Sequence, residues 1–225
     1  MLTERIKEYA EENWGSFLKS LTEISKNHNS GDSLVYDENE IYSFDDISKA
    51  LYPEQNEPAS VDGLVIGDNY LELIEFKGGF KQKITKDSFD TEKGRCPFSG
   101  DVCKDYWSIF FENQKRKIRE LVVSIKFKAL ESYITMEKQV FPRCSFEERK
   151  ALKVVLTVVI DETGVDSMED TLSELAGKNS EDNCYDSIRK ALSGLKNMED
   201  YTRTPYYYNQ INVISVQDFM NRSTT

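Results

Sequence analysis

Histidine is almost absent from this sequence, and its cysteines do not occur in close pairs. The single histidine, His28, lies in the polar stretch KNHNSGDS, so we expect no histidine-based catalytic triad. Structural zinc sites usually take their ligands from closely spaced cysteine pairs, and no C-x-x-C pair is present. We therefore interpret the cysteines as reduced thiols of a cytosolic protein. They are Cys96, Cys103, Cys144 and Cys184.

Long apolar stretches are also missing. No run of eighteen apolar residues occurs, so we expect no membrane-spanning helix. The first residues, MLTERIKEYAEENW, are charged and lack the apolar segment of a secretory signal. The expected compartment is therefore the cytoplasm. A length of 225 residues, 39% of them apolar, is enough for a hydrophobic core and favours a single domain over residues 1–225.

The chain lacks a net positive charge: 40 acidic side chains outnumber 29 basic ones, and the formal net charge at pH 7 is −11. The basic side chains are concentrated in the middle of the chain. Residues 77–153 carry 18 basic and 11 acidic side chains, whereas residues 1–76 carry 5 and 17, and residues 154–225 carry 6 and 12. A local basic surface can attract phosphate groups even on an acidic protein. The alternative is a solvated helix face with mixed charges.

The order of the expected elements predicts an α/β fold. Helices are inferred from apolar residues at helical spacing, and strands from alternating or continuous apolar runs. The expected elements are a helix over 2–25, a strand or small hairpin over 34–42, a short helix over 43–51, a hairpin over 61–77, a long helix over about 105–140, a strand at ALKVVLTVVID, helices near 167–177 and 183–197, and a strand in NQINVISVQDF. A buried strand after a long helix favours α/β over an all-β fold or a helix bundle.

The segment SVDGLVIGDNYLELIEFKGG predicts a tight β-hairpin that brings charged side chains together. Asp68 and Asn69 suit the turn, because both residue types tolerate left-handed backbone conformations. With those turn residues, Asp62 faces Glu75 across the two strands. Lys77 lies on the same face, because side chains alternate along a strand. The two carboxylates should therefore have their Cβ atoms roughly 5 Å apart.

Two adjacent carboxylates on an otherwise apolar strand face repel each other unless a cation lies between them. Hard oxygen ligands suit Mg²⁺ or Mn²⁺, and such an ion can bind a phosphate oxygen and activate a water. A nearby lysine can orient that water and stabilise the developing charge. Asp62, Glu75 and Lys77 therefore predict a metal-dependent site for phosphodiester hydrolysis.

This arrangement resembles the PD-(D/E)XK nuclease superfamily. The resemblance rests on Asp62 followed, after a hairpin, by Glu75-Phe76-Lys77, although Val61 stands where the superfamily's leading proline is found. The surrounding segments VDGLVIG and LIEFKGG look like its RecB-like and Holliday-junction-resolvase-like branches.

The resemblance implies a restriction-endonuclease-like core of a helix, a three-stranded antiparallel meander, a long helix and a buried fourth strand. This core would cover about residues 1–160, with a C-terminal extension over 161–225. The implied activity is Mg²⁺- or Mn²⁺-dependent hydrolysis of DNA in repair, recombination or defence. Asp62 and Glu75 would be metal ligands together with the backbone carbonyl of Phe76, and Lys77 would be the catalytic lysine.

The resemblance points to two further side chains. RecB-like nucleases often carry a glutamine on the helix after the lysine strand, and Gln114 lies in the apolar stripe of the long helix. The alternative for Gln114 is a polar residue at the edge of a helix interface. A helix glutamate usually completes the metal site, but Glu8, Glu11 and Glu12 lie off the apolar stripe of the first helix. We expect a third carboxylate to come from the first 60 residues.

Two functions remain open from the sequence. The first is a divalent-metal-dependent nuclease, and the second is a catalytically inactive binding or regulatory protein of the same fold. The acidic flanks and the unassigned helix glutamate favour the second. The expected partner is DNA, or alternatively RNA, through the basic middle segment, and a homo-oligomer is left open. Candidate phosphate contacts are Lys115, Arg116, Lys117 and Arg119.

Overall fold

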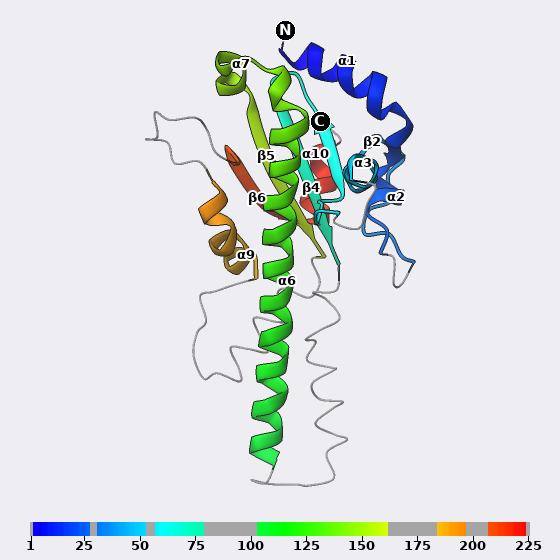
Figure 1. Cartoon of the computed structure of the whole chain (residues 1–225). Helices are drawn as coiled ribbons and strands as arrows, with labels where there is room; N and C mark the ends of the chain where they lie inside the picture. Colours follow the sequence, from blue (N-terminus) through cyan, green and yellow to red (C-terminus); the bar gives the residue numbers. More distant parts are fainter. Residues whose placement is uncertain are drawn as a thin grey trace.

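The chain folds around one open, mixed β-sheet with helices on both faces (Figure 1). The structure, a computed structural model, describes residues 2–27, 31–52, 57–78, 103–161, 184–196 and 207–223. In these residues six strands lie side by side in chain order, β1-β2-β3-β4-β5-β6. The predicted α/β class is confirmed.

The first four strands are antiparallel to one another and contain the predicted hairpin. They are β1 Leu18–Ser20, β2 Glu40–Ser43, β3 Gly63–Ile66 and β4 Tyr70–Lys77. β2, β3 and β4 form a three-stranded antiparallel meander, as expected. β1 extends it as a short edge strand beside β2.

The other half of the sheet is parallel. β5, Lys153–Ile160, pairs with the whole length of β4, and β6, Gln210–Ser215, pairs with β5. All residues of β5 except the first are buried, which agrees with a central strand and with its continuous apolar sequence. A parallel partner requires a crossover connection, and the long helix α6, Cys103–Gln139, lies in the connection from β4 to β5.

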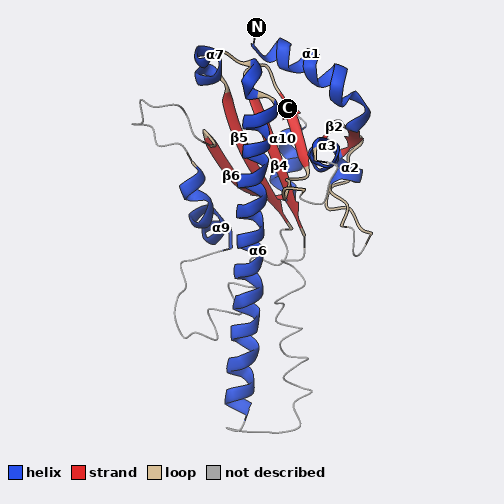
Figure 2. Cartoon of the chain, in the orientation of Figure 1, coloured by secondary structure: helices blue, strands red, loops and turns tan. Residues whose placement is uncertain are grey.

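Helices cover the two faces of the sheet unequally. Besides α6, the described residues form the helices α1 Leu2–Trp14, α2 Leu21–Ile24, α3 Phe44–Leu51, α7 Phe146–Ala151, α9 Cys184–Leu192 and α10 Val216–Ser223. They also form 3-10 turns at Gly15–Phe17, Phe141–Arg143 and Ser193–Leu195. Figure 2 shows α6 crossing one face and continuing well past the end of the sheet. Its C-terminal half therefore packs on the strands, while its N-terminal half projects from them.

Alternating residues of β4 divide the buried side chains between the two faces. Leu73 belongs to the larger core, together with Ile125 of α6. Phe76 belongs to the smaller core on the other face, where its ring lies edge-on to Phe219 of α10 with centroids 5.4 Å apart. Because side chains alternate along a strand, Glu75 shares the face of Leu73 and lies under α6.

Two predicted element boundaries are wrong in the first part of the chain. The first helix ends at Trp14 instead of residue 25, because the chain turns at Gly15–Phe17 and Leu18–Ser20 then pairs with β2. Strand pairing overrides the helical spacing of the apolar residues there. The strand predicted over 34–42 is confined to β2. The short helix from 44 to 51 is confirmed.

The C-terminal predictions are partly confirmed. The helix predicted over 183–197 is present as α9 and the 3-10 turn that follows it. The helix predicted near 167–177 lies outside the described residues. The last strand ends at Ser215, because the Ser215 hydroxyl accepts a hydrogen bond from the Asp218 amide at 3.0 Å and starts α10. Across the described parts of the chain, no helix is long and apolar enough to cross a membrane.

Candidate metal and catalytic site

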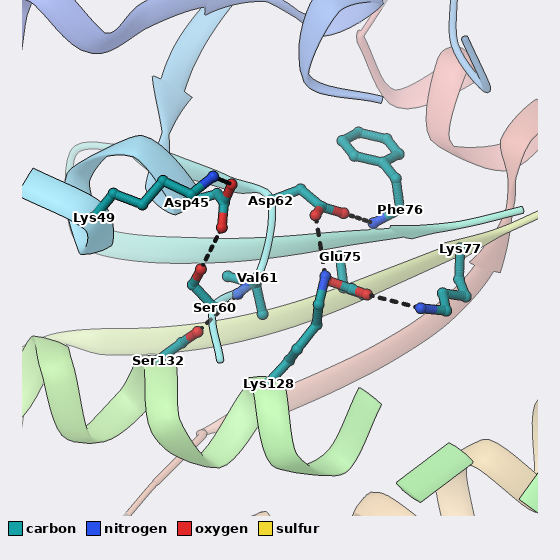
Figure 3. A network of polar contacts seen from close by, with 10 residues as sticks. All are labelled: Asp45, Lys49, Ser60, Val61, Asp62, Glu75, Phe76, Lys77, Lys128 and Ser132. Carbon is teal, nitrogen blue, oxygen red and sulfur yellow. Dashed lines mark hydrogen bonds and ion pairs between the residues drawn. The ribbon is translucent and has the colours of Figure 1, made fainter. Parts of the chain in front are cut away.

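The hairpin has the register that the sequence predicted. Gly63 is opposite Ile74 and Leu64 is opposite Leu73, and the Gly67 amide donates to the Tyr70 carbonyl at 2.9 Å across the turn. Residue 62 comes directly before β3, and residues 75 and 77 lie at the end of β4. The register therefore brings the predicted charged side chains to one end of the hairpin, as Figure 3 shows.

Asp62 is fixed by three hydrogen bonds that do not involve its Oδ1. Its amide donates to the Ile74 carbonyl at 3.0 Å, and its carbonyl accepts from the Phe44 amide at 2.9 Å. Its Oδ2 accepts from the Phe76 amide at 2.7 Å. The carboxylate is therefore anchored to β4 through one oxygen and presents the other oxygen to the space under α6.

Glu75 is completely buried beneath α6, with a side-chain exposure of 0%. Its Oε2 accepts a hydrogen bond from Lys128 at 2.9 Å. The Lys77 ammonium lies 3.8 Å from its Oε1, and this oxygen has no hydrogen-bond partner among the described residues. An ionised carboxylate in such a place needs positive charge nearby, because burial without compensation is costly.

Lys128 of α6 is the member of the cluster that the sequence did not predict. Its ammonium lies 3.2 Å from Asp62 Oδ1 and 2.9 Å from Glu75 Oε2, and so bridges the two carboxylates (Figure 3). A signal was present, because residue 128 is three positions after Ile125 and four before Ser132, both of which are buried. A lysine at that helical spacing lies beside a buried interface, so its ammonium needs either a buried partner or a path to solvent.

The electrostatics of the cluster follow from burial and from the four charges. Burial raises the pKa of Glu75 to about 8, the Asp62 charge adds to the rise, and Lys128 and Lys77 oppose it. Burial alone would lower the pKa of Lys128, but the Glu75 and Asp62 carboxylates outweigh it and raise that pKa. Lys128 therefore stays charged, and Glu75 binds the proton as the pH falls through about 8.

The cluster offers the oxygen ligands that a small divalent cation prefers. Mg²⁺ is commonly held by one or two carboxylates, with water and substrate phosphate oxygens filling the other positions. Asp62 Oδ1 and the buried, unbonded Oε1 of Glu75 fit that pattern. No group of three or more histidine, cysteine or acidic side chains arranged for a metal occurs in the part of the chain that the structure describes. The expected third carboxylate from the first 60 residues is not found in that part.

The other two predicted site residues are Phe76 and Gln114. Phe76 contributes its amide to Asp62 and its ring to the opposite core, while a ligand role for its carbonyl stays a prediction. Gln114 lies on α6 fourteen residues before Lys128, which corresponds to about 21 Å along the helix axis. The structure brings Asp62, Glu75 and Lys77 together and does not bring Gln114 to them.

The basic residues of α6 differ in the side of the helix that they occupy. Position 117 is eleven residues, or about three turns, before Lys128 and lies on the same side of α6. Arg119 is nine residues, or about two and a half turns, before Lys128 and lies on the opposite, exposed side. Arg116 is also exposed, and the side chains of Lys115 and Lys117 lie outside the described part.

Comparisons of this chain with protein-family models, with curated proteins and with solved structures found no match. The geometry and the chemistry of the cluster itself are therefore the basis for assigning a function.

Proposed function

We propose that this protein is a divalent-metal-dependent nuclease that hydrolyses phosphodiester bonds in DNA, with a PD-(D/E)XK, restriction-endonuclease-like core. The observation that carries the proposal is the meeting of Asp62, Glu75 and Lys77 at one end of the β3–β4 hairpin. One of the carboxylates is fully buried, and a protein retains such a charge pair at a cost in stability. Retention at a cost favours a chemical role.

Each residue has a separate task in this proposal. Asp62 Oδ1 and the carboxylate of Glu75 hold the cation, and the hydrogen bond from the Phe76 amide keeps Asp62 in position. Lys77, with a side-chain exposure of 21%, orients the attacking water and stabilises charge on the phosphate in the transition state. A bound Mg²⁺ or Mn²⁺ supplies Lewis-acid chemistry, which polarises the phosphate and favours ionisation of a water.

The arrangement of elements supports the same proposal. A helix, an antiparallel meander, a long helix and a buried parallel strand occur in this order over residues 2–160. That order matches the core that the sequence resemblance implies. Because one fold can serve several functions, the cluster supports catalysis more strongly than the sheet does.

A second candidate is a nucleic-acid-binding or regulatory protein of the same fold without catalysis. The observation that favours it is the Lys128 ammonium, which bridges Asp62 and Glu75. If Lys128 permanently occupies this position, the carboxylates are neutralised and unable to hold a cation. The two candidates therefore differ in whether the cluster binds a metal.

A cleavage assay separates the two candidates. Linear, circular and branched DNA, and RNA for comparison, are incubated with the protein in Mg²⁺, Mn²⁺ or EDTA. The variant Lys77→Ala should abolish cleavage while DNA affinity changes little, because its interactions are made mainly in the transition state. Lys126→Ala is the matched control, since Lys126 is an exposed lysine on α6.

Three outcomes of the cleavage assay distinguish the nuclease from the non-catalytic candidate. Metal-dependent cleavage that is lost in Lys77→Ala and kept in Lys126→Ala supports the nuclease. Cleavage by Lys77→Ala at the wild-type rate contradicts the role of Lys77. Binding of DNA without cleavage in either metal favours the non-catalytic candidate.

A further inference from the structure

The Lys128 side chain places its charge between the two carboxylates that would hold the cation. Its ammonium contacts one oxygen of each, at 3.2 Å from Asp62 Oδ1 and 2.9 Å from Glu75 Oε2. The two contacts join α6 to two strands, across 66 and 53 residues of sequence. The side chain is 25% exposed, so it is not enclosed completely by the protein.

We propose that the Lys128 ammonium is an internal cation that holds the metal position in the metal-free protein and is displaced when a divalent ion enters. This inference rests on the proposed function, because it concerns the same site. It assigns to Lys128 a regulatory role at the cluster that is separate from the role of Lys77.

The two cations exclude each other for geometric reasons. A Mg²⁺ ion lies about 2.0–2.1 Å from each ligand oxygen. An ammonium that is hydrogen-bonded to Asp62 Oδ1 and to the other oxygen of the Glu75 carboxylate would then lie close to the ion. Two positive charges at such a separation repel strongly in a partly buried site. One of the two cations must therefore leave Asp62 Oδ1, the oxygen that both would contact.

Lys128 is the group best able to move. Asp62 is tied to β4 by the Phe76 amide, and Glu75 is completely buried at the end of the same strand. Lys128 carries its charge on a flexible four-carbon stem and is partly exposed. Entry of a metal can therefore be accommodated by rotation of one side chain, without movement of the sheet.

Displacement also changes the charge that the site presents to a substrate. With all groups ionised, the Asp62 and Glu75 carboxylates are balanced by the Lys77 and Lys128 ammonium groups. A divalent ion adds two positive charges, and the released Lys128 ammonium remains beside the site on α6. The loaded site then attracts a phosphate group, whereas the metal-free site is balanced. In this way Lys128 makes attraction of the substrate phosphate depend on the metal.

Chemical modification of the wild-type protein measures this displacement directly. The protein is treated with a small amine-acylating reagent, with and without Mg²⁺, and the modification rate of each lysine is followed by peptide mass spectrometry. An ammonium held by two carboxylates reacts slowly. We expect its release to raise the rate at Lys128 by about tenfold or more, since charge-assisted hydrogen bonds oppose the reaction in the metal-free state. Lys126, exposed two residues away, is the internal control and should not change.

A second measurement on the same protein reports metal entry independently. Mn²⁺ bound between the carboxylates should broaden the amide NMR signal of Phe76, which donates to Asp62. Broadening of this signal together with faster modification of Lys128 supports the inference. Broadening with an unchanged Lys128 rate overturns the inference but leaves the proposed metal site intact. No broadening and no rate change would overturn both the inference and the proposed function.

Discussion

The burial of Glu75 changes the pH dependence of the protein's stability. Burial, reinforced by the Asp62 charge, raises the pKa of this carboxyl from 4.5 to about 8. The folded protein therefore binds the proton more tightly than the unfolded chain does. The stability that this proton contributes is complete below pH 4.5 and is lost as the pH rises through about 8.

The first prediction concerns stability between pH 5 and 9 in metal-free buffer. The free energy of unfolding of the wild-type protein should contain a component that falls with rising pH by up to about 1.4 kcal/mol per unit. Glu75→Gln should remove this component, because the amide does not titrate. Glu72→Gln, on the same strand, should keep it. Denaturant titrations at several pH values provide the measurement, and equal pH profiles for wild type and Glu75→Gln would contradict the assignment.

At the scale of elements, α6 determines the geometry of the site through two residues one turn apart. Lys128 contacts both carboxylates, and the Ser132 hydroxyl accepts a hydrogen bond from the Val61 amide at 2.9 Å. Val61 directly precedes Asp62, and both Val61 and Ser132 are buried. The helix therefore holds the segment that carries Asp62 in place.

Ser132→Ala tests this attachment. The substitution leaves the buried Val61 amide without its partner, which should lower the free energy of unfolding by about 1–3 kcal/mol. Ser124→Ala is a matched control, because Ser124 lies two turns earlier on α6 and is only partly buried. Chemical denaturation measures both variants. Equal stabilities for the two variants would show that α6 does not fix this segment.

The side of α6 that faces the site also predicts where a nucleic acid should run. Position 117 shares the side of Lys128, and Arg119 lies on the opposite side. Lys117→Glu should therefore weaken DNA binding more than Arg119→Glu, although the two substitutions change the charge equally. Fluorescence anisotropy over a salt series measures this, and loss of a phosphate contact should reduce the salt slope by about one. A larger effect of Arg119→Glu would place the nucleic acid on the other side of the helix.

The sequence predicted those elements whose signals are local. The hairpin register follows from a short turn and an alternating pattern between residues 62 and 77, and the structure has that register. Lys128 was missed because its contacts join residues more than 50 positions apart. The end of α1 was missed because pairing of Leu18–Ser20 with β2 overrides a helical pattern that continues past Gly15.

The start of α10 had a local signal that the strand pattern obscured. Ser215 and Asp218 have the spacing of a helix N-terminus, and the structure uses it. The residues before them, Gln210–Ser215, form the strand as predicted. A strand pattern and a helix start can overlap by one residue, and the capping serine marks the boundary.

At the scale of the whole molecule, the sheet and core continue across residue 160, where the nuclease-like core was expected to end. β6 pairs in parallel with β5 along six residues. Side chains from the C-terminal segment, among them Ile188, Leu192 and Val213, belong to the same core as α6. Phe219 packs on Phe76, directly beside Glu75 in β4. The C-terminal segment therefore supports the strand that carries the site.

The most direct test of the account is to locate the metal in a crystal. Crystals of the full chain are soaked in saturating Mn²⁺ at alkaline pH, because burial raises the pKa of Glu75 and so favours its neutral form at lower pH. Anomalous diffraction is recorded near the manganese edge. The account predicts a peak within coordination distance of Asp62 Oδ1 and Glu75, with the Lys128 ammonium moved away from both. A structure with no peak there, and with Lys128 still bridging the two carboxylates, would contradict the account.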